Sequence, residues 1–146
     1  MSRIAKLLAT VFGRPNLINS GVDYANWDVG GAGTTKGASG IHLVQDGSAD
    51  RAEIVISGVK PNTLYTLVLN CAAHNLDALF AFAAVYATSA TSASVTMSPS
   101  VGRMTCVFTT VANVSVAKNL YLVASSANSN GRYIDFNDVQ VYEGVV

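Results

Sequence analysis

The stretch from Val59 to Ala72, with the sequence VKPNTLYTLVLNCA, decides the fold class of this 146-residue chain. Its first part, Val59–Thr63, contains a Pro-Asn pair, which is typical of a tight turn. The part that follows, Leu64–Ala72, is an unbroken run of mostly apolar residues with the composition of a β-strand. A turn that leads directly into such a strand indicates a protein built from β-sheets.

Working outward from this stretch, short β-rich runs recur along the chain and are separated by turn residues. The expected strands are Asn16–Ile18, Tyr24–Val29, Ile41–Gln45, Ala52–Ile56, Leu64–Ala72, Leu79–Tyr86, Ser94–Met97, Arg103–Thr109, Asn119–Ala124 and Tyr133–Glu143. The run Leu79–Tyr86 is rich in alanine and also fits a helix, but its aromatic residues fall at even spacing, which favours a strand. Nine or ten short strands predict an all-β sandwich of two antiparallel sheets.

A glycine-rich stretch, Gly30–Gly40 (GGAGTTKGASG), separates two of these runs. It contains Lys36 but matches neither GxxxxGK[ST] nor GxGxxG, and no helix follows it, so it is not a phosphate-binding loop. We expect a mobile surface loop that is long enough to reach a partner. The chain shows no internal repeat and no linker, which predicts one domain, residues 16–146, after an N-terminal arm, residues 1–15.

The N-terminal arm carries apolar side chains at helical spacing with basic side chains opposite them, and Gly13 and Pro15 end the pattern. A helix this short is not stable alone in water, so it must dock on its own domain or on a neighbouring subunit. The residues expected to make this contact are Arg3, Ile4, Lys6, Leu7, Leu8, Val11, Phe12 and Arg14. The apolar stretch Leu7–Phe12 is too short for a secretory signal, and no run reaches the ~20 residues of a membrane span.

Charge is scarce and balanced, with nine Lys and Arg against nine Asp and Glu, 12% charged residues, 50% hydrophobic residues and a mean hydropathy of +0.35. This composition excludes a disordered chain, which has low hydrophobicity and high net charge. It also lacks the basic excess of a nucleic-acid-binding protein. So little charge on the exterior of a domain favours a surface that other subunits partly cover, and we expect a homo-oligomer. The alternative is that uncharged polar residues, with 14 Ser, 11 Thr and 11 Asn, keep the surface solvated.

The sequence contains no arrangement typical of an enzyme. His42 lies in a strand pattern and is expected to point outward, and no serine sits on the sharp turn that presents a nucleophile to a base. Cys71 and His74 supply the residue types of a catalytic nucleophile and base, but no sequence context supports such a pair. Glu53 and Glu143 occupy strand positions where solvation is expected, so the two opposed carboxylates of a glycosidase are missing.

No metal site and no cofactor are predicted. Cys71 and Cys106 lie inside apolar runs and are expected to be buried free thiols, with a disulfide as the alternative, and their spacing does not fit metal ligands. Asp135 and Asp138 could supply oxygen ligands to Ca²⁺. Two carboxylates in a strand are more often simply exposed.

Aromatic residues are the remaining candidates for binding. Trp27 with Tyr24 could form a platform on which a sugar ring stacks, and the same Trp27 could equally anchor the core beneath the sheets. Tyr86, in the central Ala-rich run, is the third candidate.

Several segments, in order, resemble one domain family. They are Asn16–Gly21 (NLINSG) followed by Trp27, then Val59–Thr66 (VKPNTLYT), Arg103–Thr110 (RMTCVFTT) and Tyr133–Gly144 (YIDFNDVQVYEG). Together they resemble the carbohydrate-binding-module-type jelly roll, a domain common in bacteriophage virion proteins and in glycan-binding modules. The resemblance implies a jelly-roll β-sandwich over most of residues 16–144.

Two functions follow from the resemblance. We expect a structural virion protein, a bacteriophage decoration or cement protein that binds and stabilises major capsid or other virion proteins on the capsid surface, made in the host cytoplasm. The alternative is a non-catalytic glycan-binding module for host attachment, with Tyr24, Trp27 and Tyr86 as its contacts. The family's sugar-binding modules carry exposed aromatic residues on the concave sheet, where this chain has Ala81, Ala83 and Ala84.

Asp138 matches the aspartate of the family's closing strand, which in some members helps to hold a structural Ca²⁺. No partner ligand set is evident in this sequence, so the metal is not expected here.

Overall fold

A computed structural model describes residues 17–18, 24–46, 50–56, 58–76, 80–87, 90–97, 99–110, 112, 118–122 and 131–145. Within this part the chain forms ten strands. They are β1 (Asp28–Gly30), β2 (Thr35–Gly37), β3 (Gly40–Gln45), β4 (Arg51–Ile56), β5 (Leu64–His74), β6 (Phe80–Ala87), β7 (Ala90–Met97), β8 (Gly102–Thr109), β9 (Lys118–Leu122) and β10 (Arg132–Glu143).

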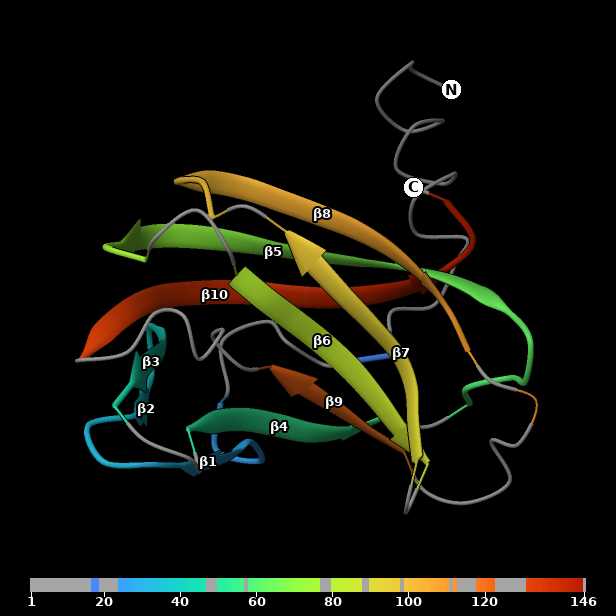
Figure 1. The fold of residues 1–146 in the computed structure, drawn as a ribbon, viewed down its shortest axis with the longest axis horizontal. Helices are drawn as coiled ribbons and strands as arrows, with labels where there is room; N and C mark the ends of the chain where they lie inside the picture. The colour runs from blue at the N-terminus through green and yellow to red at the C-terminus, as the bar shows by residue number, and fades with distance from the viewer. Residues whose placement is uncertain are drawn as a thin grey trace.

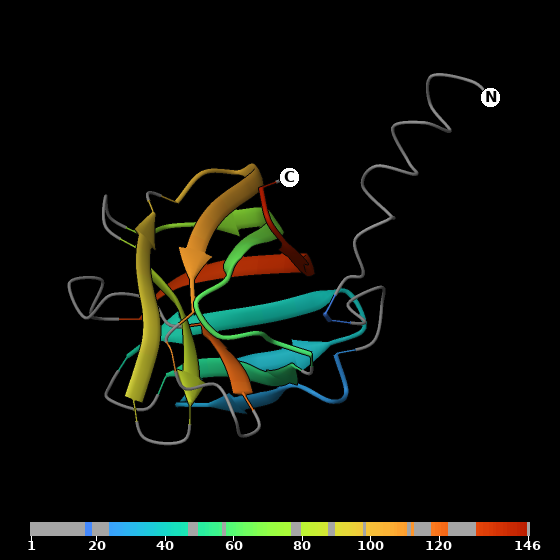
Figure 2. The same cartoon turned by 90° about the vertical axis from the view of Figure 1, so that its right-hand side faces the viewer.

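The strands make two five-stranded sheets, in the orders β1-β4-β9-β6-β7 and β2-β3-β10-β5-β8, and every recorded pairing is antiparallel. Figure 1 shows β5, β8 and β10 side by side in one layer, with β6 and β7 in the layer in front of them. Figure 2 places β6 and β7 on the side of the molecule opposite β3. The predicted all-β, jelly-roll type of sandwich is confirmed.

The sequence placed most strands correctly but missed several local features. The Ala-rich run is a strand, β6, as its even aromatic spacing predicts. The turn at Tyr24–Trp27 was expected to be part of a strand, but β1 begins only at Asp28. The expected mobile loop at Gly30–Gly40 contains strand β2, which pairs with β3, so the loop prediction is wrong at residues 35–37. Composition alone did not reveal this pairing.

The core lies between the sheets because the strands alternate in the direction of their side chains. In β8, Met104, Cys106 and Phe108 are buried while the residues between them are exposed. In β10, Ile134 and Phe136 are less than 2% exposed and point inward from the central strand of their sheet. Apolar strands therefore stack face to face, as the sandwich pattern requires.

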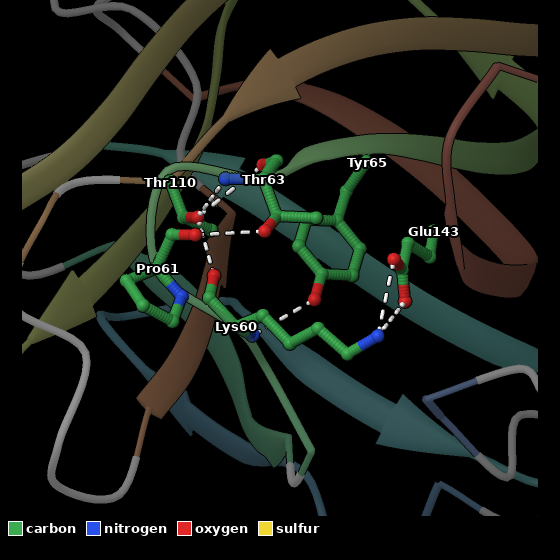
Figure 3. Close-up of polar contacts among 6 residues, drawn as sticks. All are labelled: Lys60, Pro61, Thr63, Tyr65, Thr110 and Glu143. Carbon is green, nitrogen blue, oxygen red and sulfur yellow. Dashed lines mark hydrogen bonds and ion pairs between the residues drawn. The ribbon is translucent and has the colours of Figure 1, made fainter.

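The turn at Val59–Thr63 is held by polar contacts, shown in Figure 3. The hydroxyl of buried Tyr65 accepts a hydrogen bond of 2.8 Å from the backbone amide of Lys60, five residues upstream. Thr110, which is 3% exposed, donates to the carbonyl of Lys60 at 2.6 Å and accepts from the amide of Thr63 at 2.9 Å. Asn62 has a φ of 48°, a left-handed conformation that asparagine tolerates. This network explains why the Pro-Asn-Thr-x-Tyr pattern marks the entry to β5.

Both cysteines are buried free thiols, as expected. Their register shows why they do not pair: Cys106 lies opposite Leu67, and Cys71 lies opposite Gly102. Four residues of strand separate the two positions, about 13 Å at strand rise, and a disulfide needs Cα atoms within about 7 Å.

Burial raises the pKa of the Cys106 thiol to about 11, from an ordinary value near 9. Above pH 9 the unfolded chain loses this proton while the folded chain keeps it, so the stability contributed below pH 9 is lost as the pH rises toward 11. We expect this to remove about 2–3 kcal/mol from the free energy of unfolding. Urea unfolding between pH 8 and 11 should show that the free energy of unfolding falls less steeply with pH in Cys106→Ala than in the parent or in Cys71→Ala. Equal slopes in the parent and Cys106→Ala would contradict it.

The N-terminal arm and its expected contact residues, Arg3 to Arg14, lie outside the described residues. The division into an arm and one domain stays a prediction. Leu17 and Ile18 are described: the amide of Leu17 donates to the carbonyl of Val141 at 2.9 Å, and Ile18 is 1% exposed. The chain therefore lies alongside β10 at this point, although no strand is assigned there.

Candidate functional site

A hollow of about 480 Å³ lies at the end of the second sheet where strands β2, β3, β10 and β5 meet. Its polar residues come from four of the strands and turns around it: Thr35, Lys36, Ser39, His42, Asp135 and Asn137. Small-molecule sites in proteins have volumes of about 300–1,000 Å³, so the hollow is large enough for a ligand.

Strand register turns the side chains of His42 and Asp135 to the solvent face of the sheet, whereas Lys36 lies opposite inward-facing Ile41. His42 lies opposite Asp135, and its neighbours Ile41 and Leu43 are 1% and 0% exposed. Because consecutive side chains of a strand point to opposite faces, His42 must point away from the core, as the sequence predicted. The same alternation turns Asp135 outward between buried Ile134 and Phe136.

The strongest polar contact of the hollow joins His42 and Asp135. His42 Nδ1 lies 2.5 Å from Asp135 Oδ1, and the two side chains remain 40% and 37% exposed. The imidazole also packs against the ring of Tyr133, with ring centroids 5.0 Å apart and planes tilted by 34°. These contacts fix the orientation of the carboxylate and leave both groups partly open to solvent.

Asn137 is the next polar group along β10, and it is held by a neighbour on β5. The side-chain amide of Asn70 donates to Asn137 Oδ1 at 3.0 Å. This bond uses the acceptor of Asn137 and leaves its own amide group oriented as a donor. Asp135 and Asn137 therefore present an acceptor and a donor to the same hollow.

The hairpin formed by β2 and β3, residues 35–42, makes one wall of the hollow. Thr35, Lys36 and Gly37 pair with His42, Ile41 and Gly40. At its base, Thr34 Oγ1 donates to the carbonyl of Val44 at 3.3 Å and accepts from its amide at 3.1 Å.

Gly40 packs the turn of this hairpin against β10. Its φ is 145°, and an added Cβ would lie 2.4 Å from the carbonyl oxygen of Phe136. Only glycine fits this approach without movement of backbone.

Two of the three predicted glycan contacts are in the core. Tyr24 is 3% exposed and Trp27 is 1% exposed, so neither ring offers a face to a sugar. Trp27 packs against Tyr24 and Phe136, with centroids 6.4 Å and 6.5 Å away. Of the two roles left open for Trp27, its burial supports the core anchor, and the sugar platform at Tyr24 and Trp27 is corrected.

Tyr24 instead binds the backbone of the last strand, β10. Its hydroxyl accepts a hydrogen bond of 2.8 Å from the amide of Asp138, and burial raises the pKa of the Tyr24 phenol. Asp138 has a φ of 50° at an irregularity of β10, between its pairings to β5. Tyr86 belongs to β6, but its side chain lies outside the described part of the structure.

Three other titratable residues considered from the sequence, Glu53, Glu143 and Asp138, have side-chain partners. Glu53 accepts from Arg51 at 3.2 Å, and Glu143 forms an ion pair with Lys60 at 3.0 Å. The side chain of Asp138 accepts from Gln140. Among the described residues, no three His, Cys, Asp or Glu side chains gather as a metal site would require. Nor does this part of the chain contain a helix long and apolar enough to cross a membrane.

Sequence reasoning considered Asp135 only as a Ca²⁺ ligand and gave no binding role to His42, Asn137 or Asn70. The alternation of β3 and β10 was enough to place His42 and Asp135 outward. Which strands lie side by side was not readable from the sequence, because β3, β5 and β10 are far apart along the chain.

No protein-family model matches this chain, and neither does any curated protein. Solved structures do match it. A family 16 carbohydrate-binding module superposes with a TM-score of 0.52 at 16% identity, covering 87% of this chain and 99% of the other. A mutant family 29 carbohydrate-binding module from work on ligand recognition gives 0.53 at 16% identity, covering 89% and 91%. A family 4 module, CBM4, gives 0.50 at 12% identity, covering 86% and 84%.

These likenesses show the fold, a sandwich of the type found in carbohydrate-binding modules. The part of the expected resemblance that concerns this fold is confirmed. The structures named above say nothing of a virion, so the capsid role, the virion partners and the virion location stay predictions.

Proposed function

We propose that the protein is a non-catalytic carbohydrate-binding module that holds an oligosaccharide in the hollow. The observation that carries the proposal is the convergence of His42, Asp135 and Asn137 on one open cavity of a sandwich whose structural neighbours are carbohydrate-binding modules.

The chemistry of the hollow suits sugar hydroxyl groups. Each hydroxyl both donates and accepts, so neighbouring hydroxyls are bound best by an acceptor and a donor side by side. Asp135 supplies a charged acceptor and Asn137 supplies an amide donor. The ring of His42, which packs against Tyr133, adds a surface on which the apolar face of a sugar can pack.

The same geometry supports binding rather than hydrolysis. Glycoside hydrolysis uses two carboxyl groups on opposite sides of the scissile bond. Of the described residues that line the hollow, Asp135 is the one carboxylate. A single acidic group can hold a sugar but has no second carboxylate with which to complete this reaction.

The test is binding of the full chain to an array of neutral and acidic oligosaccharides, followed by titration calorimetry with the oligosaccharide that binds best. We expect saturable binding with a Kd of about 1 μM to 1 mM, a free energy of roughly −8 to −4 kcal/mol. Absence of saturable binding to every member of the array would overturn the proposal. The heat-denatured chain is the control for non-specific adsorption.

A further inference from the structure

Lys36 lies on an exposed hairpin, yet its side chain is hydrogen-bonded to the backbone of another segment. Its ammonium group donates hydrogen bonds to the carbonyl of Ala25 at 2.7 Å and to the carbonyl of Trp27 at 2.6 Å. Lys36 itself lies in the middle of β2, whose three residues are all exposed. The side chain therefore ties the hairpin to a segment that leads into the other sheet.

The segment that receives these bonds is fixed in place. The amide of Trp27 donates to the carbonyl of Tyr24 at 3.1 Å, which closes a turn. The side chains of Tyr24 and Trp27 are both buried in the core. The two carbonyls that accept from Lys36 thus belong to backbone that cannot shift without disturbing the packed interior.

Apart from the close approach of Gly40 to β10, the hairpin has a short strand pairing to hold it. β2 lies at the edge of its sheet and pairs with β3 over three residues. Gly37 lies at the tip, where glycine leaves the backbone its widest choice of conformations. An added Cβ at Gly37 would meet nothing within 4 Å, so side-chain packing does not constrain that position.

A positive charge also suits this location. The pKa of Asp28 is lowered, chiefly by its hydrogen bond with Arg51, and the nearby charge of Lys36 adds to the effect. A neutral side chain in place of Lys36 would lose the two hydrogen bonds to the carbonyls of Ala25 and Trp27.

We infer that Lys36 is the positioning residue of the ligand site, holding the hairpin of residues 35–42 in the place where it forms a wall of the hollow. The inference rests on the proposed function. When the wall is already in place, binding does not have to order it, and affinity is correspondingly higher. When Lys36 is replaced, the ligand must order the hairpin itself, and we expect binding to be about tenfold weaker.

The experiment compares three variants of the full chain. Lys36→Met keeps an unbranched side chain of similar length and removes its donors. Lys36→Arg keeps donors that can reach both carbonyls and tests rescue. Lys60→Met is the matched control, because Lys60 is an exposed lysine whose partner, Glu143, is not among the residues that line the hollow. Amide hydrogen exchange by mass spectrometry and titration with the best-bound oligosaccharide of the array are measured on each.

We expect peptides covering residues 35–42 to exchange about tenfold faster or more in Lys36→Met, with exchange in β5 and β10 unchanged. Affinity should fall about tenfold in the same variant, be largely restored in Lys36→Arg and stay at the parental value in Lys60→Met. Unchanged hairpin exchange in Lys36→Met overturns the inference. Faster exchange with unchanged affinity also overturns it, because the hairpin would then not be a wall of the ligand site.

Failure of the proposed function gives a different result. The parent chain then binds no oligosaccharide, and the ligand-site role of Lys36 falls with it. The exchange data still decide, independently of any ligand, whether Lys36 holds the hairpin.

Discussion

Replacing Trp27 with alanine is expected to lower the free energy of unfolding by about 3–5 kcal/mol, the range found for large aromatic residues removed from cores. The side chain is 1% exposed and contacts the rings of Tyr24 and Phe136. A domain of ordinary stability has about 5–15 kcal/mol in total, so the loss is severe. Urea unfolding followed by circular dichroism measures the change in stability. Tryptophan fluorescence cannot be used, since Trp27 is the single tryptophan of the chain.

Trp27→Phe is the matched control. The indole Nε1 of Trp27 is buried and has no hydrogen-bond partner in the described part of the structure. Phenylalanine keeps an aromatic ring in the core and removes this unsatisfied donor, whose burial is itself unfavourable. We expect Trp27→Phe to lose roughly half as much stability as Trp27→Ala, or less, and to keep its affinity for oligosaccharide. If Trp27→Ala were as stable as the parent, the core-anchor role would be wrong.

The second large effect is expected at Asp135. Asp135→Asn should reduce affinity for the best-bound oligosaccharide by about 10- to 100-fold, because a hydrogen bond to a charged group contributes about 1.5–3 kcal/mol. The substitution keeps the size of the side chain and removes its charge. Asparagine keeps one uncharged acceptor oxygen and replaces the other carboxylate oxygen with an amide donor, which changes the contact with His42 as well. Titration calorimetry measures the change.

Asp138→Asn is the control for this prediction. It makes the same chemical change three residues further along β10, on an exposed residue that is not among those lining the hollow. Asparagine tolerates the left-handed conformation that Asp138 adopts, so the backbone is not strained by the change. Affinity should stay within about twofold of the parent. Equal losses of affinity in the two variants would contradict a specific contact between Asp135 and the ligand, and would point to a general effect on strand β10.

The sequence carried most of the fold because local rules decide it. The strand alternation of β8, the turn before β5 and the buried thiols all follow from neighbours along the chain, and the structure has each of them. The edge strand β2 escaped prediction because its three residues, Thr-Lys-Gly, have no apolar pattern. Its pairing with β3 comes from the turn between the two strands and from contacts of Thr34 and Lys36 with residues ten and nine positions away, which a search for apolar patterns does not detect.

The site was less predictable than the fold. Aromatic residues drew attention to Tyr24 and Trp27, and burial shows them serving the core instead. The sequence around a tryptophan does not distinguish a sugar-binding platform from a core anchor, since both roles need a large flat ring. His42 and Asp135 are 93 residues apart in sequence and meet only because β3 and β10 pair in that register.

By itself, the sequence determined that this protein is an all-β sandwich with an apolar interior. The alternation of side chains along strands and the chemistry of turns both depend on residues that are neighbours in the sequence. The tertiary structure alone decided which outward-facing side chains share a surface. Strand order and register are set by the packing of the whole domain, and they place a carboxylate, an imidazole and an amide around one hollow with a lysine holding its wall.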